Sequence, residues 1–181
     1  MPSIGHVMVG MAAGRLQARQ RKELVGSMLL FSVVSMLPDA DAIGFKLGVP
    51  YGAPFGHRGA MHSLAMAVIL AVALGLAARL ARRPALRVGL VAFAALALHD
   101  LCDAVTNGGL GVALWWPFSN ERIFLPWRPL PVAPIGLNGM LAPRGLRVMA
   151  AELIVFAPFL LYALVPRRGV RAPEASQPAV R

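Results

Sequence analysis

The sequence predicts an all-α integral membrane protein, a helical bundle of four to five helices with one long Pro/Gly/Trp-rich loop. Composition is the first reason: 57% of the 181 residues are hydrophobic, 14% are charged, and the mean hydropathy is +0.65. Soluble domains are closer to half apolar and a quarter charged. The second reason is that the apolar residues gather in five runs separated by basic or Pro/Gly-rich segments. A chain of this length forms one compact domain.

The five runs are taken in chain order. Residues 3–14 end at a basic cluster, and residues 24–37 stop at Pro38. Residues 44–60 are too rich in Gly and Pro for a helix. Long apolar helices are expected over residues 61–81 and from Pro84 to near Thr106, and residues 107–146 form the irregular loop that holds all three tryptophans. The last helix is expected over 147–165, with a bend at Pro158.

Several runs are shorter than the roughly 20 apolar residues that a full membrane span needs. Polar residues therefore complete some spans, or some helices are only partly inserted, and in either case a polar cavity opens at one end. We expect residues 1–166 to form a membrane-embedded helical domain and residues 167–181 to be a disordered basic tail.

Charge predicts the orientation of the bundle. If the five helices alternate in direction, twelve of the 18 basic residues lie on one side, in the links at 15–23 and 79–87 and in the C-terminal tail. The positive-inside rule places that side in the cytoplasm. Because the basic residues flank apolar runs, the net charge of +10 indicates juxtamembrane anchoring and no nucleic-acid partner.

Ionisable residues concentrate at the opposite, non-cytoplasmic end. His99 and Asp103 are four residues apart and share one helix face. Charged groups at membrane depth face a cavity or a partner rather than lipid. Four segments supply the candidate metal ligands: His6; Asp39 and Asp41; His57 and His62; and His99 with Asp103.

Nitrogen and oxygen donors suit a divalent ion, zinc first, with manganese or magnesium as alternatives. The number of carboxylates leaves room for two ions, an arrangement that favours phosphoester hydrolysis. Asp100 is a candidate general base, because it lies beside the ligands but about 100° around the helix from them. Arg58 is a candidate for holding an anionic substrate oxygen, with a lipid headgroup contact as the alternative.

Simpler interpretations stay open for several of these residues. His6 taken alone fits a packed polar residue, and Asp39 and Asp41 fit the end of a helix. The lone Cys102 is expected to be a packed thiol. Glu152 fits a site residue or a helix-packing residue equally well. The three tryptophans fit residues at the membrane interface.

Motifs in this order resemble the membrane-bound metal-dependent hydrolases, a group that includes the LexA-binding, inner membrane-associated hydrolases. The matching pieces are Gly5-His6, Leu37-Pro38-Asp39 with Asp41, His57-Arg58-Gly59 with His62-Ser63, and His99-Asp100 with Asp103, Thr106 and Gly109, followed by Trp116-Pro117-Phe118. The resemblance implies that His6, Asp39, Asp41, His57, His62, His99 and Asp103 are the ligands. It also implies an inner membrane location and a distant similarity to zinc-dependent phospholipase C, although only one H-x3-D pair is present.

The predicted function is therefore a membrane-bound, metal-dependent hydrolase of a lipid or lipid-linked envelope intermediate, with its site on the non-cytoplasmic side. The alternative is a non-catalytic membrane protein that binds or transports a divalent metal ion or a proton. A transporter should carry ionisable groups along the whole crossing, whereas this sequence gathers them at one end.

Overall fold

The computed structural model describes residues 3–166, and all regular secondary structure among them is helical. No β-strand occurs in this range, although single β-bridges join Thr106 to Leu130 and Val112 to Ile123. The all-α prediction is confirmed for these residues. The predicted disordered tail, residues 167–181, lies outside the described part of the chain.

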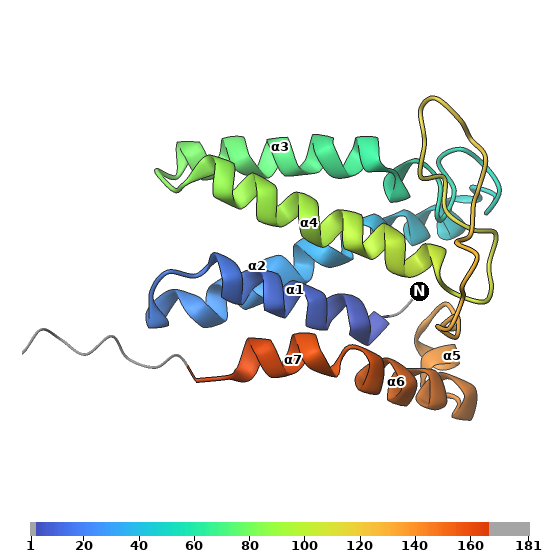
Figure 1. Cartoon of the computed structure of the whole chain (residues 1–181). Coiled ribbons are helices and arrows are strands. Elements are labelled where there is room, and N and C mark those ends of the chain that lie inside the picture. The colour runs from blue at the N-terminus through green and yellow to red at the C-terminus, as the bar shows by residue number, and fades with distance from the viewer. Residues whose placement is uncertain (1–2, 167–181) are drawn as a thin grey trace, which may run out of the picture.

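Seven α-helices and three 3-10 helices make up this range (Figure 1). The α-helices are α1 (Ser3–Gln17), α2 (Leu24–Met36), α3 (Leu64–Leu80), α4 (Ala85–Ala104), α5 (Leu137–Leu141), α6 (Pro143–Val155) and α7 (Ala157–Leu164). The 3-10 helices are η1 (Arg21–Glu23), η2 (Pro38–Leu47) and η3 (Ala60–His62).

The structure differs from the predicted elements in three places. The expected last helix is in fact two helices, α6 and α7, with an angle of 60° between them. Pro158 lies in the first turn of α7, so the predicted bend is confirmed. Helix η2 extends into the segment predicted as a loop, and α5 forms within the stretch predicted as irregular. Helix α5 is only 5 residues long and η2 is a 3-10 helix, and the apolar periodicity of the sequence does not reveal such elements.

Within residues 3–166, only α4 is long and apolar enough to cross a membrane by itself. Two bent pairs, residues 21–36 with η2 and α6 with α7, raise the number of spans to at most three if each pair is one broken span. Helix α3 is apolar but only 17 residues long. Crossing by four or five helices therefore stays a prediction.

Helices α1 and α2 approach closely because glycines lie between them. A Cβ atom on Gly10 would lie 2.4 Å from the Cα of Ser32, and one on Gly14 would lie 2.3 Å from the carbonyl oxygen of Ser27. Small residues at such crossings let two helix backbones come together, which is a common device in membrane bundles.

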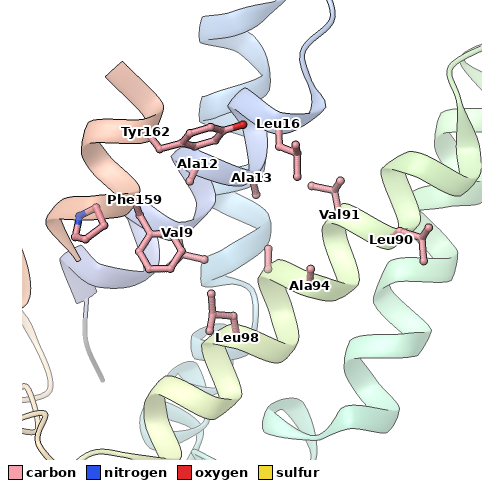
Figure 2. Close-up of a pocket in the computed structure, with 12 residues that line it drawn as sticks. Val9, Ala12, Ala13, Leu16, Leu90, Val91, Ala94, Leu98, Phe159 and Tyr162 are labelled. Carbon is pink, nitrogen blue, oxygen red and sulfur yellow. The ribbon is translucent and has the colours of Figure 1, made fainter. Parts of the chain in front are cut away.

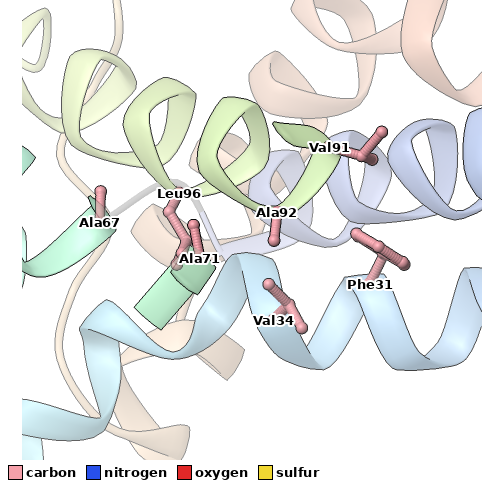
Figure 3. Close-up of a cluster of buried hydrophobic side chains, with 7 residues drawn as sticks. All are labelled: Phe31, Val34, Ala67, Ala71, Val91, Ala92 and Leu96. Atoms are coloured by element: carbon pink, nitrogen blue, oxygen red, sulfur yellow. The ribbon is translucent and has the colours of Figure 1, made fainter. Parts of the chain in front are cut away.

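Two apolar clusters hold the bundle. The first joins α2, α3 and α4 through seven buried residues, shown in Figure 3: Phe31, Val34, Ala67, Ala71, Val91, Ala92 and Leu96. The second joins α1 to the far end of α4 and to the α6–α7 bend, and consists of Met8, Val9, Cys102, Leu130 and Phe156. Cys102 is a buried member of this cluster, as predicted.

The two ends of the bundle differ in character. The α1–α2 and α3–α4 links lie at one end, whereas the starts of α1 and α3, the end of α4, η2, α5 and the long loop lie at the other (Figure 1). A groove of about 650 Å³ between α1, α4 and α7 is lined almost wholly by apolar side chains, including Val9, Leu98 and Phe159 (Figure 2). We call the second end, with η2 and α5, the polar end.

Candidate metal centre

The predicted ligand residues come together at the polar end from four elements and one loop. His6 is in the first turns of α1, Asp39 and Asp41 are in η2, and His62 ends η3. His99 and Asp103 are in the last two turns of α4, and His57 is in the loop before η3. The side chains of all seven residues are at most 4% exposed.

Four of these residues form a compact group of metal-ligating atoms. Asp39, His62, His99 and Asp103 each offer one nitrogen or oxygen, and these atoms lie within 4.8 Å of one another. His62 Nε2 is 3.2 Å from His99 Nε2, 3.4 Å from Asp39 Oδ1 and 3.5 Å from Asp103 Oδ2. His99 Nε2 is 3.7 Å from Asp39 Oδ1. We call these four residues the inner quartet.

The tautomer of His99 makes its Nε2 atom a lone-pair donor toward the quartet. Its Nδ1 atom is 2.7 Å from the carbonyl oxygen of Ser35 on α2. A carbonyl oxygen only accepts hydrogen bonds, so Nδ1 carries the proton and Nε2 of the neutral ring does not. His62 Nδ1 makes no hydrogen bond among the described residues, but it lies 3.0 Å from Asp41 Oδ2, and this carboxylate favours the proton on Nδ1.

The distances within the quartet fit a shared cation. Two nitrogens that bind one zinc ion tetrahedrally at about 2.0–2.1 Å are about 3.3–3.4 Å apart. Four of the six separations in the quartet are 3.2–3.7 Å, which brackets this value, and all six are within 4.8 Å. Two imidazole lone pairs that face each other in a buried site also need either a proton or a cation between them. The residues present therefore fit a divalent ion.

Asp41, His57 and His62 form a second group of ligating atoms, and its distances are different. Asp41 Oδ1 is 2.6 Å from His57 Nδ1, and Asp41 Oδ2 accepts a hydrogen bond of 3.1 Å from the backbone N–H of Arg58. These are hydrogen-bond lengths. In this geometry Asp41 is a carboxylate that orients two imidazoles, a common arrangement behind metal-binding histidines.

Electrostatics favour a proton on His62 when no cation is bound. Burial disfavours the charged ring, but hydrogen bonds to Asp103, Asp39 and Asp41 outweigh burial and raise the pKa of His62 well above its usual value. A divalent ion in the quartet would take the place of the Nε2 proton. The site therefore favours a positive charge at this position, either a proton or a metal ion.

His6 is next to the quartet but is not part of it. Its ring stacks on His99 with centroids 3.6 Å apart, and its Nε2 is 3.5 Å from Asp103 Oδ1. Neither ring nitrogen has a hydrogen-bond partner among the described residues, although His6 is fully buried. Its geometry leaves both a supporting role and a ligand role available.

Arg58 lies against the quartet and contacts one of its carboxylates. Its Nε is 2.9 Å from Asp103 Oδ2, and its Nη1 donates to Thr106 Oγ1 and to the carbonyl oxygen of Gly108. The Thr106 hydroxyl in turn donates to the carbonyl oxygen of Asp103. Arg58 therefore fixes the Asp103 carboxylate and ties the end of α4 to the loop before η3.

The loop before η3 depends on glycines for its shape. A Cβ atom on Gly56 or Gly59 would lie 2.2 Å from a backbone oxygen, of Pro50 and Pro54 respectively. Arg58 adopts a positive φ of 62°. This tight path, predicted from the two glycines, carries His57, Arg58 and His62 to one side of the centre. Ser63 then caps α3, where its Oγ accepts from the backbone N–H of Met66.

Asp100 is buried in α4 but lies outside both groups of ligating atoms. Neither of its carboxyl oxygens has a hydrogen-bond partner within residues 3–166. A buried polar group without a partner calls for an explanation, and a catalytic role is one of the usual ones.

Two further residues support the centre: sequence reasoning left Glu152 between a site role and a helix-packing role, and it gave Arg122 no role. Glu152 of α6 accepts hydrogen bonds from the backbone N–H groups of Ile4 and Gly5, so it anchors the start of α1 and with it His6. Arg122 donates to the carbonyl oxygens of His57, Tyr51 and Ala53 and thereby holds the loop before η3. The residues joined by these contacts are 65 to 148 positions apart in the sequence, so no local pattern reveals them.

Comparison with known proteins places the chain in a family. The model of the YdjM inner membrane protein family matches residues 1–171. The inner membrane protein YbcI of Escherichia coli (strain K12) is 41% identical over 143 residues, which cover 77% of this chain and 83% of that protein. No solved structure gives a significant match.

Both descriptions name inner membrane proteins, which supports the predicted inner membrane location. Neither description names a hydrolase, LexA binding or a phospholipase C, so those parts of the predicted resemblance stay predictions. The family model spans almost the whole chain, including every residue of the metal centre. The chain belongs to the YdjM inner membrane protein family.

Proposed function

We propose that this inner membrane protein is a metal-dependent hydrolase that cleaves a phosphoester or another bond in a lipid or a lipid-linked envelope intermediate. The inner quartet would hold one divalent ion, with zinc as the first choice and manganese or magnesium as alternatives. The observation that carries the proposal is a group of four buried ligand atoms from three elements, all within 4.8 Å of one another and 3.2–3.7 Å apart in four of the six pairs.

The ion would supply a Lewis acid that activates water and polarises the bond to be cleaved. The protein's own groups prepare the site for that chemistry. Asp41 fixes the His62 ring so that Nε2 points into the quartet, and Ser35 does the same for His99. Arg58 holds Asp103 in place.

Proton transfer needs a further group, and we assign it to Asp100. Its carboxyl is buried beside the ligands on α4 and has no hydrogen-bond partner among the described residues. In this proposal it accepts a proton from an attacking water, which is the role of a general base. His6 and His57 would complete the wall of the site, and either becomes a ligand if a second ion binds.

The location of the centre supports a lipid or lipid-linked substrate. It lies at the polar end, where the starts of α1 and α3 meet the end of α4, and not midway along the bundle (Figure 1). We place this end at the non-cytoplasmic face, in accordance with the charge distribution of the links. Trp115, Phe118 and Trp127 in the long loop are exposed, as side chains at a headgroup interface would be.

Turnover measurements test the proposal. Detergent-purified protein, with and without added zinc or manganese, would be incubated with a panel of phospholipids and lipid pyrophosphates. We expect metal-dependent product formation that is lost in both His62→Ala and Asp103→Ala and kept in Glu121→Ala, which alters an exposed loop residue. Asp100→Asn should keep its metal and lose turnover.

Two results would overturn the hydrolase assignment. The first is product formation in His62→Ala and Asp103→Ala at the wild-type rate. The second is stoichiometric metal with no turnover on any member of the panel, which would favour the alternative, a protein that binds or transports a metal ion or a proton.

A further inference from the structure

A second cavity lies directly beside the metal centre. Its volume is about 260 Å³, below the roughly 300–1,000 Å³ typical of sites that enclose a whole small ligand. It therefore suits a headgroup rather than an entire lipid. Its lining comes from the loop before η3, the long loop and α6, and consists of Tyr51, His57, Arg58, Gly109, residues 132–135 and Arg144.

The cavity and the metal centre share two walls. His57 lines the cavity and is hydrogen-bonded to Asp41 Oδ1, while Asp41 Oδ2 lies 3.0 Å from His62 Nδ1. Arg58 also lines it, and its Nε is 2.9 Å from the quartet carboxylate of Asp103. Only the side chains of His57 and Arg58 would separate a group bound in the cavity from the metal centre.

The lining of the cavity carries two cationic side chains and no carboxylate. Arg58 contributes a buried guanidinium, and Arg144 contributes an exposed one from α6. Arg58 Nη1 is occupied by Thr106 and Gly108, but Nη2 has no hydrogen-bond acceptor among the described residues. An unmet buried guanidinium donor is costly, and an anionic oxygen is its strongest partner.

Because Gly109 has no side chain, the long loop comes close to Tyr51 and Arg58 at this corner of the cavity. Gly109 has a positive φ of 88°, and a Cβ atom there would lie 2.7 Å from the Tyr51 hydroxyl and 3.1 Å from Arg58 Nη1. The Tyr51 hydroxyl and the Arg58 guanidinium thus border the same small space, and both can donate hydrogen bonds to one anion. Residues 132–135 add an apolar wall.

We propose that this cavity binds the phosphate group of the substrate and that Arg144 sets the preference for phosphate-bearing over neutral lipids. The proposal rests on the proposed function, because it places the substrate's anionic group beside the metal centre. Arg58 forms the buried part of the phosphate site, and the half-buried Tyr51 lies next to it. Arg144 closes the site from α6.

Direct binding tests this with short-chain lipids. The affinities of dihexanoyl phosphatidic acid, inorganic phosphate and neutral dihexanoylglycerol would be measured by calorimetry on detergent-purified, full-length protein. We expect Arg144→Gln to weaken binding of the phosphatidic acid about tenfold or more and to leave dihexanoylglycerol unchanged. Arg147→Gln is the matched control, because it removes the same charge from an exposed position on the same helix outside the cavity.

The two phosphate ligands distinguish the source of the anion. Binding of phosphatidic acid but not of inorganic phosphate identifies a lipid headgroup, whereas equal binding of both identifies a free phosphate site. The inference is overturned if Arg144→Gln binds phosphatidic acid as tightly as wild type, or if Arg147→Gln loses as much affinity. Arg144 is exposed, so its replacement is not expected to prevent folding.

The same samples separate this inference from the proposed function. Metal content and turnover would be measured in parallel on each variant. If the wild type binds metal and hydrolyses lipids but Arg144→Gln has an unchanged KM for phosphate-bearing substrates, the cavity inference fails and the hydrolase stands. If phosphatidic acid binding depends on Arg144 but no lipid is hydrolysed, the hydrolase fails and the phosphate site stands.

Discussion

Replacement of Asp41 by asparagine tests how the centre is prepared for metal. The Asp41 carboxylate accepts hydrogen bonds from His57 Nδ1 at 2.6 Å and from the Arg58 backbone N–H at 3.1 Å, and its Oδ2 lies 3.0 Å from His62 Nδ1. An asparagine amide keeps one accepting oxygen and turns an NH2 group toward the other donors. If that NH2 faces His62, the ring is driven to the tautomer with its proton on Nε2, the atom that faces the quartet.

The expected size of the effect follows from this contact. Loss of a carboxylate behind a metal-binding histidine lowers metal affinity about 10- to 100-fold. That range corresponds to about 1.4–2.8 kcal/mol. We expect Asp41→Asn to weaken zinc binding by this factor, whereas Asp39→Asn, which replaces a charged quartet ligand by a neutral amide, should abolish binding.

Competition with a chromophoric zinc chelator in detergent would give the affinities, and circular dichroism would check that each variant is folded. Glu121→Gln is the matched control, since it makes the same chemical change in an exposed loop. Affinity within twofold of wild type in Asp41→Asn would refute the orienting role. Complete loss of binding, as in Asp39→Asn, would show that Asp41 is itself a ligand.

Three further predictions concern the scaffold. Glu152→Ala removes the acceptor for two N–H groups at the start of α1. The free energy of unfolding should therefore fall by about 1.5–3 kcal/mol, and the thermal midpoint should drop. An unchanged midpoint would contradict the anchoring role. Gly10→Ala should lower the free energy of unfolding by disturbing the α1–α2 crossing. A Cβ atom on Gly26 would meet no atom within 4 Å, so Gly26→Ala should leave the free energy of unfolding unchanged or raise it by up to about 1 kcal/mol. Equal losses in both variants would refute the close approach. Arg122→Gln should release the loop before η3 and speed its hydrogen exchange, and Arg128→Gln should not; unchanged exchange in Arg122→Gln would count against the role of its three carbonyl contacts.

The sequence predicted which residues gather at one end, because the length and polarity of the apolar runs specify where each helix starts and stops. His99 and Asp103 fall four apart on one helix, and the H-R-G-x-x-H-S segment comes just before the next. Their convergence with Asp39 required only that neighbouring helices run in opposite directions. Local patterns were sufficient for this part of the site.

Pairings between distant segments could not be predicted in the same way. That Arg58 holds an anionic substrate oxygen stays a prediction, but the pairing of its Nε with Asp103, 45 positions further along the chain, was not expected. Glu152 fitted two roles until its contact with α1 resolved them. The length of η2 was missed as well, because a 3-10 helix with Asp and Gly in it has no strong periodic signature.

The most direct measurement of the central claim is the metal content of the purified protein. Detergent-purified wild type and His99→Ala, both checked for folding by circular dichroism, would be analysed for zinc, manganese and magnesium per chain. We expect close to one divalent ion per wild-type chain and none in His99→Ala, which lacks one nitrogen of the quartet. A wild-type protein that stays free of divalent metal after zinc supplementation, or a His99→Ala variant that keeps the full complement, would contradict the account.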